Sequence, residues 1–362
     1  MTITNKKIIF SSGGTGGHIF PTLGIVEYFM KKGHQVKIVT DLRGSQYIKN
    51  NSQIKLFILN TDTPFNKMYF KKIYSYLKIF LSIIKSLFFL IREKPNLVFG
   101  LGGYVSFPLS ISARILNISL VIYENNVVIG KTNNFLLPFA KKVLIASDKI
   151  YNCPTKYKNK IHLVGHILRK KITDHSLRKE KKRDDSFSIV VLGGSQGAEV
   201  FGKSTPLAVK KLKESGYRIK IFHQCIKKQK DSLIDFYNNN KIENNVFEFT
   251  DNILEYMLNS DIAITRCGAS TTAELIYTQT PFIAVPYPHA MDNHQFHNAK
   301  YYENKGYCWM IEQTNFNDEV LFNLILKILK DKKKLDNIRE NMKKKDTYNT
   351  NENIERAVEE FL

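Results

Sequence analysis

The chain has 362 residues, of which 43% are hydrophobic and 24% are charged, a composition typical of a globular protein large enough for two domains. Its formal net charge is +21, and residues 1–164 hold 23 Lys and Arg against 6 Asp and Glu. This uneven charge implies an anionic partner such as nucleic acid, a lipid surface or a phosphorylated substrate, although Lys- and Asn-rich coding bias also raises the total. The four cysteines lack CxxC spacing, which argues against a zinc site or a disulfide framework.

The first predicted elements surround the glycine-rich stretch GGTGG at 13–17, which His18 follows. IIF (8–10) predicts a buried parallel strand, residues 20–33 predict an amphipathic helix closed by Gly33, and QVKIVT (35–40) predicts a second strand. Glycines at the carboxyl end of such a strand let backbone N–H groups approach a phosphate, so we expect an anion site here. No apolar h-region of the length that a signal peptide needs precedes them, so we expect no signal peptide and a cytosolic or cytosol-facing protein.

Two other functions share parts of this pattern. Asp41, after the second strand, stands where a ribose-binding acid of a nicotinamide enzyme would stand, but Ile19 occupies the third glycine position of GxGxxG. The basic charge fits a nucleic-acid-binding protein, yet no helix-turn-helix, zinc-finger or RNP pattern accompanies it. Both functions are therefore less favoured, and a single glycine stretch can also serve a turn alone.

Residues 68–94 predict a long helix that is the most apolar part of the chain. Its polar residues recur at helical spacing and form one narrow stripe: Ser75, Lys78, Ser82, Lys85 and Ser86. The wide apolar arc, flanked by Lys71, Lys72 and Arg92, favours a helix over 73–91 that lies on a membrane surface rather than crossing it. A wholly internal helix is the alternative.

The strand, glycine loop and helix pattern occurs twice more. GLGGYVSFP (100–108) follows the strand NLVF, and GGSQG (193–197) follows FSIVVL. Residues 170–186 between them are charged and lack an apolar period, as in a linker. Three such loops, divided by a linker, predict two α/β domains.

Residues 260–299 predict strand IAIT, a helix that begins near Ser270, and a second strand followed by a polar loop. Glu274 on that helix can accept two hydrogen bonds from the vicinal hydroxyls of a ribose. It can equally cap the helix, because the helix dipole favours a carboxylate there. The residues alone leave both roles open.

Seven segments together resemble, in order and spacing from about residue 6 to 315, the motifs of the MurG family of bacterial glycosyltransferases. They are GGTGGHIFP, GLGGYVSFP, YENNVVIGKTN, GGSQGA, FHQ, TRCGASTTAEL and HAMDNHQFHNA. The family transfers N-acetylglucosamine from UDP-N-acetylglucosamine to undecaprenyl-pyrophosphoryl-N-acetylmuramoyl-pentapeptide (lipid I), giving lipid II for peptidoglycan. Where the family usually has Gly-Asn-Pro-Val-Arg, this chain has Gly165-His166-Ile167-Leu168-Arg169, so the resemblance does not imply the geometry of that turn.

The resemblance implies an α/β fold of two facing Rossmann-like domains (GT-B architecture) with a deep interdomain cleft. It implies a domain over 1–164 for the lipid acceptor and the membrane, a linker over 165–186 and a UDP-sugar domain over 187–340. A C-terminal helix over 341–362 is expected to pack on the first domain. It implies no cofactor, no metal and no nucleic-acid partner. We expect a peripheral protein on the cytoplasmic face of the plasma (inner) membrane, with residues 73–91 on the anionic surface.

Carried over by position, the resemblance implies that these residues bind the substrates: Thr15, Gly16, Gly17, Tyr104, Asn126, Arg169, Ser195, Gln196, Phe249, Thr250, Ala269, Ser270, Thr271, Thr272, Ala273, Glu274, Gln295 and Asn298. Glycosyl transfer needs a base for the acceptor hydroxyl and charge stabilisation for the leaving diphosphate. His18 beside the glycines is the candidate base. Its alternatives are a contact to the acceptor's phosphate or a cap of the helix.

Two rival functions remain open from the sequence. One is a GT-B glycosyltransferase that acts on another lipid, such as diacylglycerol. The other, more distant, is a non-enzymatic binder of nucleotides or nucleic acid.

Overall fold

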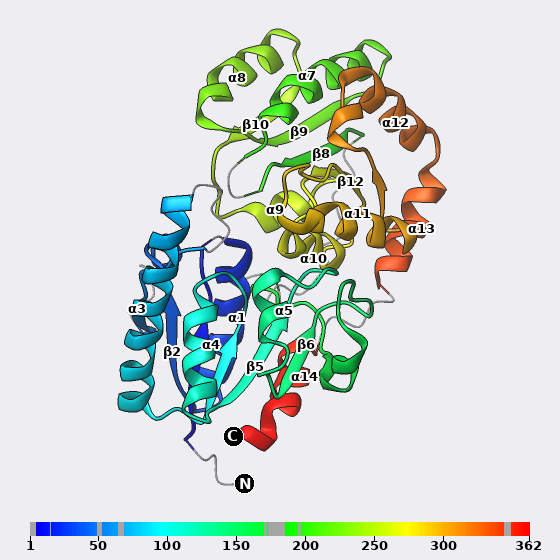
Figure 1. The fold of residues 1–362 in the computed structure, drawn as a ribbon. Coiled ribbons are helices and arrows are strands. Elements are labelled where there is room, and N and C mark those ends of the chain that lie inside the picture. The colour runs from blue at the N-terminus through cyan, green and yellow to red at the C-terminus, as the bar shows by residue number, and fades with distance from the viewer. Residues whose placement is uncertain are drawn as a thin grey trace. The chain divides into compact units, whose positions relative to one another are not determined.

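The computed structural model describes residues 5–14, 16–48, 53–63, 69–169, 172, 185–194, 197–343 and 349–362. The chain divides into two compact units (Figure 1). Unit 1 contains Met1–Lys170 and Thr347–Leu362, and unit 2 contains Lys171–Asp346. Most of the expected linker, residues 170–171 and 173–184, lies outside the described residues.

Unit 1 contains a parallel seven-stranded sheet in the order β3-β2-β1-β4-β5-β6-β7. Its strands are β1 (Lys7–Ser11), β2 (Gln35–Thr40), β3 (Lys55–Ile58), β4 (Leu97–Gly100), β5 (Ser119–Glu124), β6 (Lys142–Ile145) and β7 (Ile161–Leu163). Its helices are α1 (Gly16–Lys31), α2 (Leu42–Gln46), α3 (Tyr69–Glu93), α4 (Ser106–Ile115), α5 (Lys131–Leu136), α14 (Thr350–Val358) and the short η1 (Thr155–Lys160) and η5 (Glu359–Phe361). The central strands are apolar runs, because helices cover both faces of the sheet.

The two faces of this sheet have separate cores. One core joins α1 to α14, whose Ile354 and Val358 are fully buried in it. The other joins α4 and α5 to Leu90 near the end of α3. The last helix therefore belongs to unit 1, although the chain reaches it only after unit 2.

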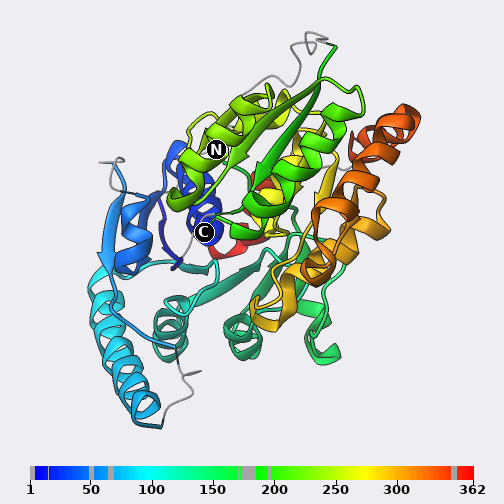
Figure 2. The ribbon, with the colours of Figure 1, turned by 90° about the horizontal axis from the view of Figure 1, so that it is seen from above.

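Helix α3 runs beside α4 at the outer edge of unit 1 (Figures 1 and 2). Its serines are buried: Ser75 donates to Asp62, Ser82 donates to the carbonyl of Asn60, and Ser112 of α4 donates to the carbonyl of Ile83. Ile79 and Leu90 are also buried, whereas eight of its large apolar side chains are about half exposed or more: Ile73, Tyr74, Tyr76, Leu77, Phe80, Leu81, Phe88 and Ile91. The serines of the polar stripe thus face the protein, Lys85 of the same stripe is exposed, and much of the apolar arc faces away from the protein. The alternative of a wholly internal helix is therefore wrong.

Unit 2 contains a parallel six-stranded sheet in the order β10-β9-β8-β11-β12-β13. Its strands are β8 (Phe187–Leu192), β9 (Ile219–Gln224), β10 (Glu243–Phe247), β11 (Ile262–Thr265), β12 (Phe282–Ala284) and β13 (Cys308–Met310). Its helices are α7 (Glu199–Glu214), α8 (Lys230–Asn239), α9 (Ile253–Leu258), α10 (Ala269–Tyr277), α11 (His294–Asn304), α12 (Asp318–Lys330), α13 (Lys332–Lys343) and the short η2 (Lys227–Gln229), η3 (Met291–Asn293) and η4 (Gln313–Asn315). Two parallel sheets with alternating helices confirm the expected two-domain α/β fold.

The C-terminal boundary differs from the expected one. Helix α13 continues past residue 340 to Lys343, because Leu335, Ile338 and Met342 form one buried face along it. The helix expected over 341–362 is therefore the end of α13 followed by the separate α14.

The core of unit 2 contains a buried histidine. His223 on β9 is fully buried, and its Nδ1 lies 2.8 Å from the hydroxyl of Tyr237 on α8. Burial lowers the pKa of His223 to about 3, because the charged imidazolium would lose its hydration there. The folded unit therefore keeps this ring neutral at a pH where the unfolded chain protonates it.

We predict that acid destabilises unit 2 partly through His223. An unfolded histidine titrates near pH 6.5, so as the pH falls from about 6.5 toward 3 the unfolded state binds a proton that the folded state excludes. This group lowers the free energy of unfolding by up to about 1.4 kcal/mol per pH unit in that window. Urea unfolding followed by the fluorescence of Trp309, the single tryptophan, measures it.

The control is the double variant H223F/Y237F, which removes the imidazole together with its partner. Its stability should fall less steeply between pH 6.5 and 4 than that of the wild type. Equal slopes in the two proteins would contradict the assignment.

Candidate functional site

The candidate residues of unit 1 surround the switch point of its sheet, where the order of the strands reverses. Strands β1 and β4 are neighbours, and the chain order runs outward from them to the two edges of the sheet. The loops after these two strands contain the first and second glycine stretches. In open α/β sheets ligands bind at such switch points.

The two glycine loops of unit 1 pack backbone against backbone. A Cβ atom on Gly103, whose φ is +77°, would lie 3.1 Å from the carbonyl oxygen of Gly13. One on Gly13 would lie 2.6 Å from Val105. Ser106 further ties the loops, because its hydroxyl contacts the carbonyls of Ser11 and Gly102 at 3.1 and 2.7 Å. Only glycine permits this approach.

Gly16, Gly17 and His18 form the first turn of α1. The ring of His18 reaches the second loop, where its Nδ1 lies 3.1 Å from the carbonyl oxygen of Leu101. Because a carbonyl only accepts, Nδ1 carries the proton of the neutral ring and Nε2 is its basic nitrogen. This geometry supports a base more than a helix cap.

Tyr104 is held by a carboxylate whose role sequence reasoning missed. Its hydroxyl donates to Oδ2 of Asp41 at 2.8 Å, while Oδ1 of Asp41 accepts from the N–H of Gly14 at 3.2 Å and of Gly44 at 2.7 Å. Asp41 therefore orders both glycine loops rather than binding a ribose. Because β1 and β2 are adjacent, the sheet order brings Asp41 to Gly14.

Asn126 lies just beyond β5 and is oriented by Glu124. The buried carboxylate accepts from the backbone and side-chain N–H groups of Asn126 at 3.0 and 3.1 Å. Its other oxygen accepts from Gly130 and Asn133, both at 2.9 Å. Glu124 therefore shapes the 125–130 loop, and its place in the YENN segment was the available signal.

The turn that departs from the family pattern has its own hydrogen-bond network. His166 is 1% exposed, with Nδ1 2.9 Å from Oδ1 of Asn125. The hydroxyl of Tyr123 lies 3.1 Å from the carbonyl oxygen of Gly165 and accepts from the N–H of Ile167 at 3.2 Å. This network fixes the turn that leads to Arg169.

Arg169 lies against α1. The guanidinium carbon is 5.0 Å from the centre of the Phe20 ring, an arrangement that favours a cation over an aromatic face. Unit 1 thus brings Arg169 to the helix that begins with the first glycine loop.

In unit 2 the order of the strands reverses between the neighbouring strands β8 and β11. The N–H of Gly193, after β8, donates to Oε1 of Gln224 at 3.1 Å, and Nε2 of Gln224 lies 3.3 Å from the carbonyl oxygen of Glu248. Gln224 therefore joins the third glycine loop to the segment before Phe249. This glutamine lies within the FHQ segment, whose sequence alone did not predict its role.

The loop after β11 leads into α10, whose first turn begins at Ala269. Ser270 and Thr271 are partly exposed there. The first backbone N–H groups of a helix have no partner within it, so this turn can bind a phosphate.

Farther along α10 the side chains turn inward. The hydroxyl of Thr272 lies 3.0 Å from the carbonyl of Gly268, and Ala273 is buried, so both side chains face the protein. Glu274 is 6% exposed and stands beyond the first turn. A cap must lie at the start of the helix, so the capping alternative does not fit Glu274.

Phe249 and Thr250 follow β10. Phe249 is 71% exposed, an unusual position for a large aromatic ring and one suited to stacking on a flat ligand. The hydroxyl of Thr250 accepts from the N–H of Asn252 at 3.0 Å, which shapes the turn behind it.

Gln295 and Asn298 lie on α11. Oε1 of Gln295 accepts from the N–H of Tyr287 at 3.0 Å. Asn298 is 1% exposed, and its amide donates to the carbonyl of Cys267 at 3.1 Å, so its observed contact holds the loop before α10. Asp292 and Asn293 before α11 are both left-handed, with φ of 52° and 53°.

Thr15, Ser195 and Gln196 lie outside the described residues. Within the described part of the chain, no group of three or more His, Cys, Asp or Glu side chains could hold a metal ion.

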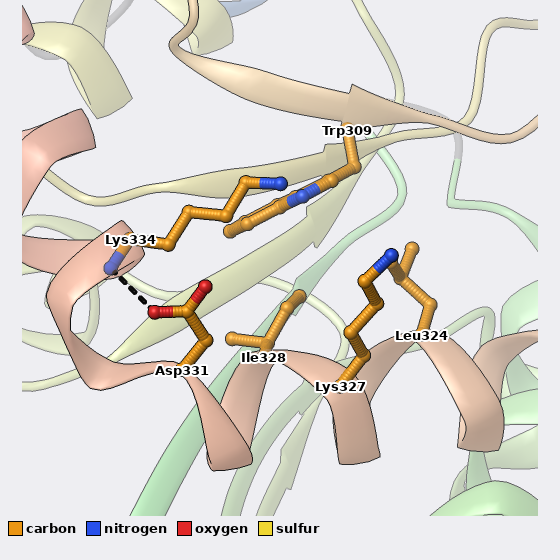
Figure 3. Close-up of a pocket in the computed structure, with 6 residues that line it drawn as sticks. All are labelled: Trp309, Leu324, Lys327, Ile328, Asp331 and Lys334. Carbon is orange, nitrogen blue, oxygen red and sulfur yellow. Dashed lines mark hydrogen bonds between the residues drawn. The ribbon is translucent and has the colours of Figure 1, made fainter.

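One pocket of unit 2 lies apart from these residues (Figure 3). It has a volume of about 60 Å³, and Lys334 extends over the ring of Trp309 in it. None of its lining residues is a candidate site residue: Trp309, Leu324, Lys327, Ile328, Asp331 and Lys334.

Comparison with known proteins places both units in one family. The glycosyltransferase family 28 N-terminal domain matches residues 8–145, and the C-terminal domain of the same family matches residues 188–356.

Relatives match the chain over nearly its whole length. A Pelagibacter ubique protein named UDP-N-acetylglucosamine–N-acetylmuramyl-(pentapeptide) pyrophosphoryl-undecaprenol N-acetylglucosamine transferase is 35% identical over 97% of each chain. A protein of the same name from Rickettsia bellii is 34% identical over 94% of this chain and 95% of its own. The crystal structure of Acinetobacter baumannii MurG is 24% identical, with a TM-score of 0.79 over 98% of this chain and 99% of that one, and has the same fold.

Proposed function

Because the chain belongs to glycosyltransferase family 28, we propose that it transfers N-acetylglucosamine from UDP-N-acetylglucosamine to undecaprenyl-pyrophosphoryl-N-acetylmuramoyl-pentapeptide. The product is lipid II, a precursor of peptidoglycan. The observation that carries the proposal is the match to relatives of that name over almost the whole of both chains, which includes the glycine loops of both units.

Unit 2 binds the donor in this proposal. The first turn of α10 and the loop at Gly193 bind the diphosphate, the exposed ring of Phe249 stacks on the uracil, and Glu274 accepts from the ribose hydroxyls. Gln295 forms hydrogen bonds with hydroxyls of the sugar. Arg169 and helix N–H groups supply positive charge that stabilises the leaving diphosphate.

Unit 1 binds the acceptor and supplies the base. Nε2 of His18 takes the proton of the acceptor hydroxyl as its oxygen bonds to the anomeric carbon. The bond from that carbon to the diphosphate breaks, and UDP leaves with the electron pair. Attack from the opposite face inverts the anomeric centre.

The rival acceptor is a neutral glycerolipid such as diacylglycerol. The experiment offers a short-chain lipid I analogue and diacylglycerol in parallel, with radiolabelled UDP-N-acetylglucosamine as the donor. The acceptor that becomes labelled distinguishes the two functions. We expect label only in the disaccharide of the lipid I analogue. Label in diacylglycerol alone would overturn the proposed function.

We predict that E274A weakens UDP binding roughly ten- to a hundredfold, because the charged hydrogen bonds to the ribose are lost. Calorimetry with UDP measures the dissociation constant. E255A removes an exposed carboxylate from α9 of the same unit and should leave that constant unchanged. Unchanged affinity in E274A would disprove the ribose contact.

We predict that H18A lowers kcat about 10²–10⁴-fold, because a positioned base contributes that much to proton transfer. The affinity for UDP should change little. A rise in the acceptor KM alone, with kcat unchanged, would instead make His18 a phosphate contact.

The outward apolar arc of α3 supports the proposal that this helix contacts a membrane surface. Among the described residues α3 is the one helix long and apolar enough to cross a bilayer, over Lys72–Glu93, but its buried serines bind it to unit 1. A helix held in this way with an exposed apolar arc suits a position in the plane of a membrane surface. The protein is then peripheral, on the cytoplasmic face where the acceptor's lipid is anchored.

The charges along α3 fit an anionic surface. Its only acidic side chain is Glu93, which Lys37 and Lys7 contact at 2.6 and 3.3 Å. Although burial opposes it, hydrogen bonds from these lysines hold the pKa of Glu93 below its usual value. Lys142 is bonded to Glu360 and to the carbonyl of Ala357, so it is left out of this surface.

We predict that L77S/F80S/F88S abolishes sedimentation with anionic vesicles, because three exposed apolar side chains no longer insert. Transfer to a water-soluble acceptor analogue should continue. The control L163S/L207S/V320S removes three exposed apolar side chains elsewhere and should still sediment. Persistent binding of the folded α3 variant would place the membrane surface elsewhere.

A further inference from the structure

Arg43 on α2 lies over the first glycine loop of unit 1. Its Nη2 would be 3.3 Å from a Cβ atom on Gly14, and its guanidinium carbon is 5.4 Å from the centre of the Tyr104 ring. The same group contacts the hydroxyl of Tyr104 and Oδ2 of Asp41. A cation therefore stands where the two glycine loops meet.

The pairing with Asp41 does not explain this position. Nε and Nη2 lie 3.4 and 3.3 Å from one oxygen of Asp41, which is longer than the usual about 2.7–2.9 Å of a strong charged pair. Asp41 already accepts from Gly14, Gly44 and Tyr104, whereas the Arg43 side chain is 59% exposed. Within the described residues Nη1 of Arg43 has no partner. A pair of this kind adds little stability.

The arrangement is suited to a phosphate. A guanidinium binds phosphate oxygens through two parallel N–H groups, and the contacts to Asp41 and Tyr104 limit the orientations of the side chain before a ligand arrives. Of the two substrates in the proposed function, the acceptor for unit 1 carries a diphosphate. A neutral glycerolipid offers Arg43 no such group.

We infer that Arg43 binds the diphosphate of the lipid-linked acceptor and so selects diphosphate-linked acceptors over neutral lipids. This inference rests on the proposed function. Asp41 and Tyr104 act as positioning residues, because they hold the guanidinium beside Gly14. Arg43 is a binding residue in addition to those that the resemblance implied.

Two measurements with R43Q test the inference. The first is kcat/KM for a short-chain lipid I analogue, which should fall roughly ten- to a hundredfold, mainly through KM, because a charged contact is lost. R43K should retain part of this activity. The KM for UDP-N-acetylglucosamine and the affinity for UDP should stay within about twofold, because Arg43 belongs to unit 1 and the proposed donor site to unit 2.

The second measurement is direct binding of farnesyl diphosphate and farnesyl monophosphate by calorimetry, which needs no turnover. The wild type should prefer the diphosphate, and R43Q should lose that preference. R114Q, which removes an exposed arginine of α4 in the same unit, should behave as the wild type in both measurements.

The inference is wrong if R43Q matches R114Q, or if R43Q loses UDP affinity as strongly as acceptor affinity. A wild type that binds farnesyl diphosphate through Arg43 but transfers no sugar to the lipid I analogue would contradict the proposed function and leave the anion site standing. If the wild type is active on the lipid I analogue but does not prefer farnesyl diphosphate, and the kinetics of R43Q are unchanged, the inference about Arg43 is wrong and the proposed function stands.

Discussion

The backbone contact between Gly13 and Gly103 is the constraint on which the site of unit 1 depends. Because neither residue has a side chain, the loops after β1 and β4 come so close that a Cβ atom on Gly103 would lie 3.1–3.4 Å from the backbone of Gly13. This approach brings the ring of His18 from one loop to the carbonyl of Leu101 in the other. It also brings Tyr104 to Asp41, and with them Arg43. The imidazole of His18, the ring of Tyr104 and the guanidinium of Arg43 are thus all placed by one close approach.

Helix α3 has two sides of unlike chemical character. An ordinary surface helix buries its apolar side and exposes its polar side. Here the small serine side chains lie inside, bonded to Asp62 and to the carbonyl of Asn60, and Phe80 and Phe88 lie outside. In water alone the exposed apolar area has an unfavourable free energy of hydration that nothing offsets, whereas a lipid surface removes that area from water. The basic charge of residues 1–164 is consistent with such a surface.

Local patterns predicted the elements well, and non-local contacts account for what they missed. QVKIVT became β2 over Gln35–Thr40, and the helix expected near Ser270 begins at Ala269. Spacing identified the serine stripe of α3 but not the side it faces, because periodicity says only which residues share a face. Asp41 and Gln224 act across neighbouring strands, so their partners follow from the strand order. The position of Thr272 and Asn298 in the sequence did not predict that their side chains donate to the backbone carbonyls of Gly268 and Cys267.

In the proposed function the two switch points bind different ligands, with the nucleotide at the one in unit 2. Hydrogen exchange of the whole protein, with and without UDP, distinguishes the two sites, because slower exchange marks the peptides that a ligand orders. We expect UDP to protect the first turn of α10 and the Glu248–Thr250 segment more strongly than the Leu101–Val105 loop. Protection centred on Leu101–Val105, with α10 unchanged, would contradict this assignment.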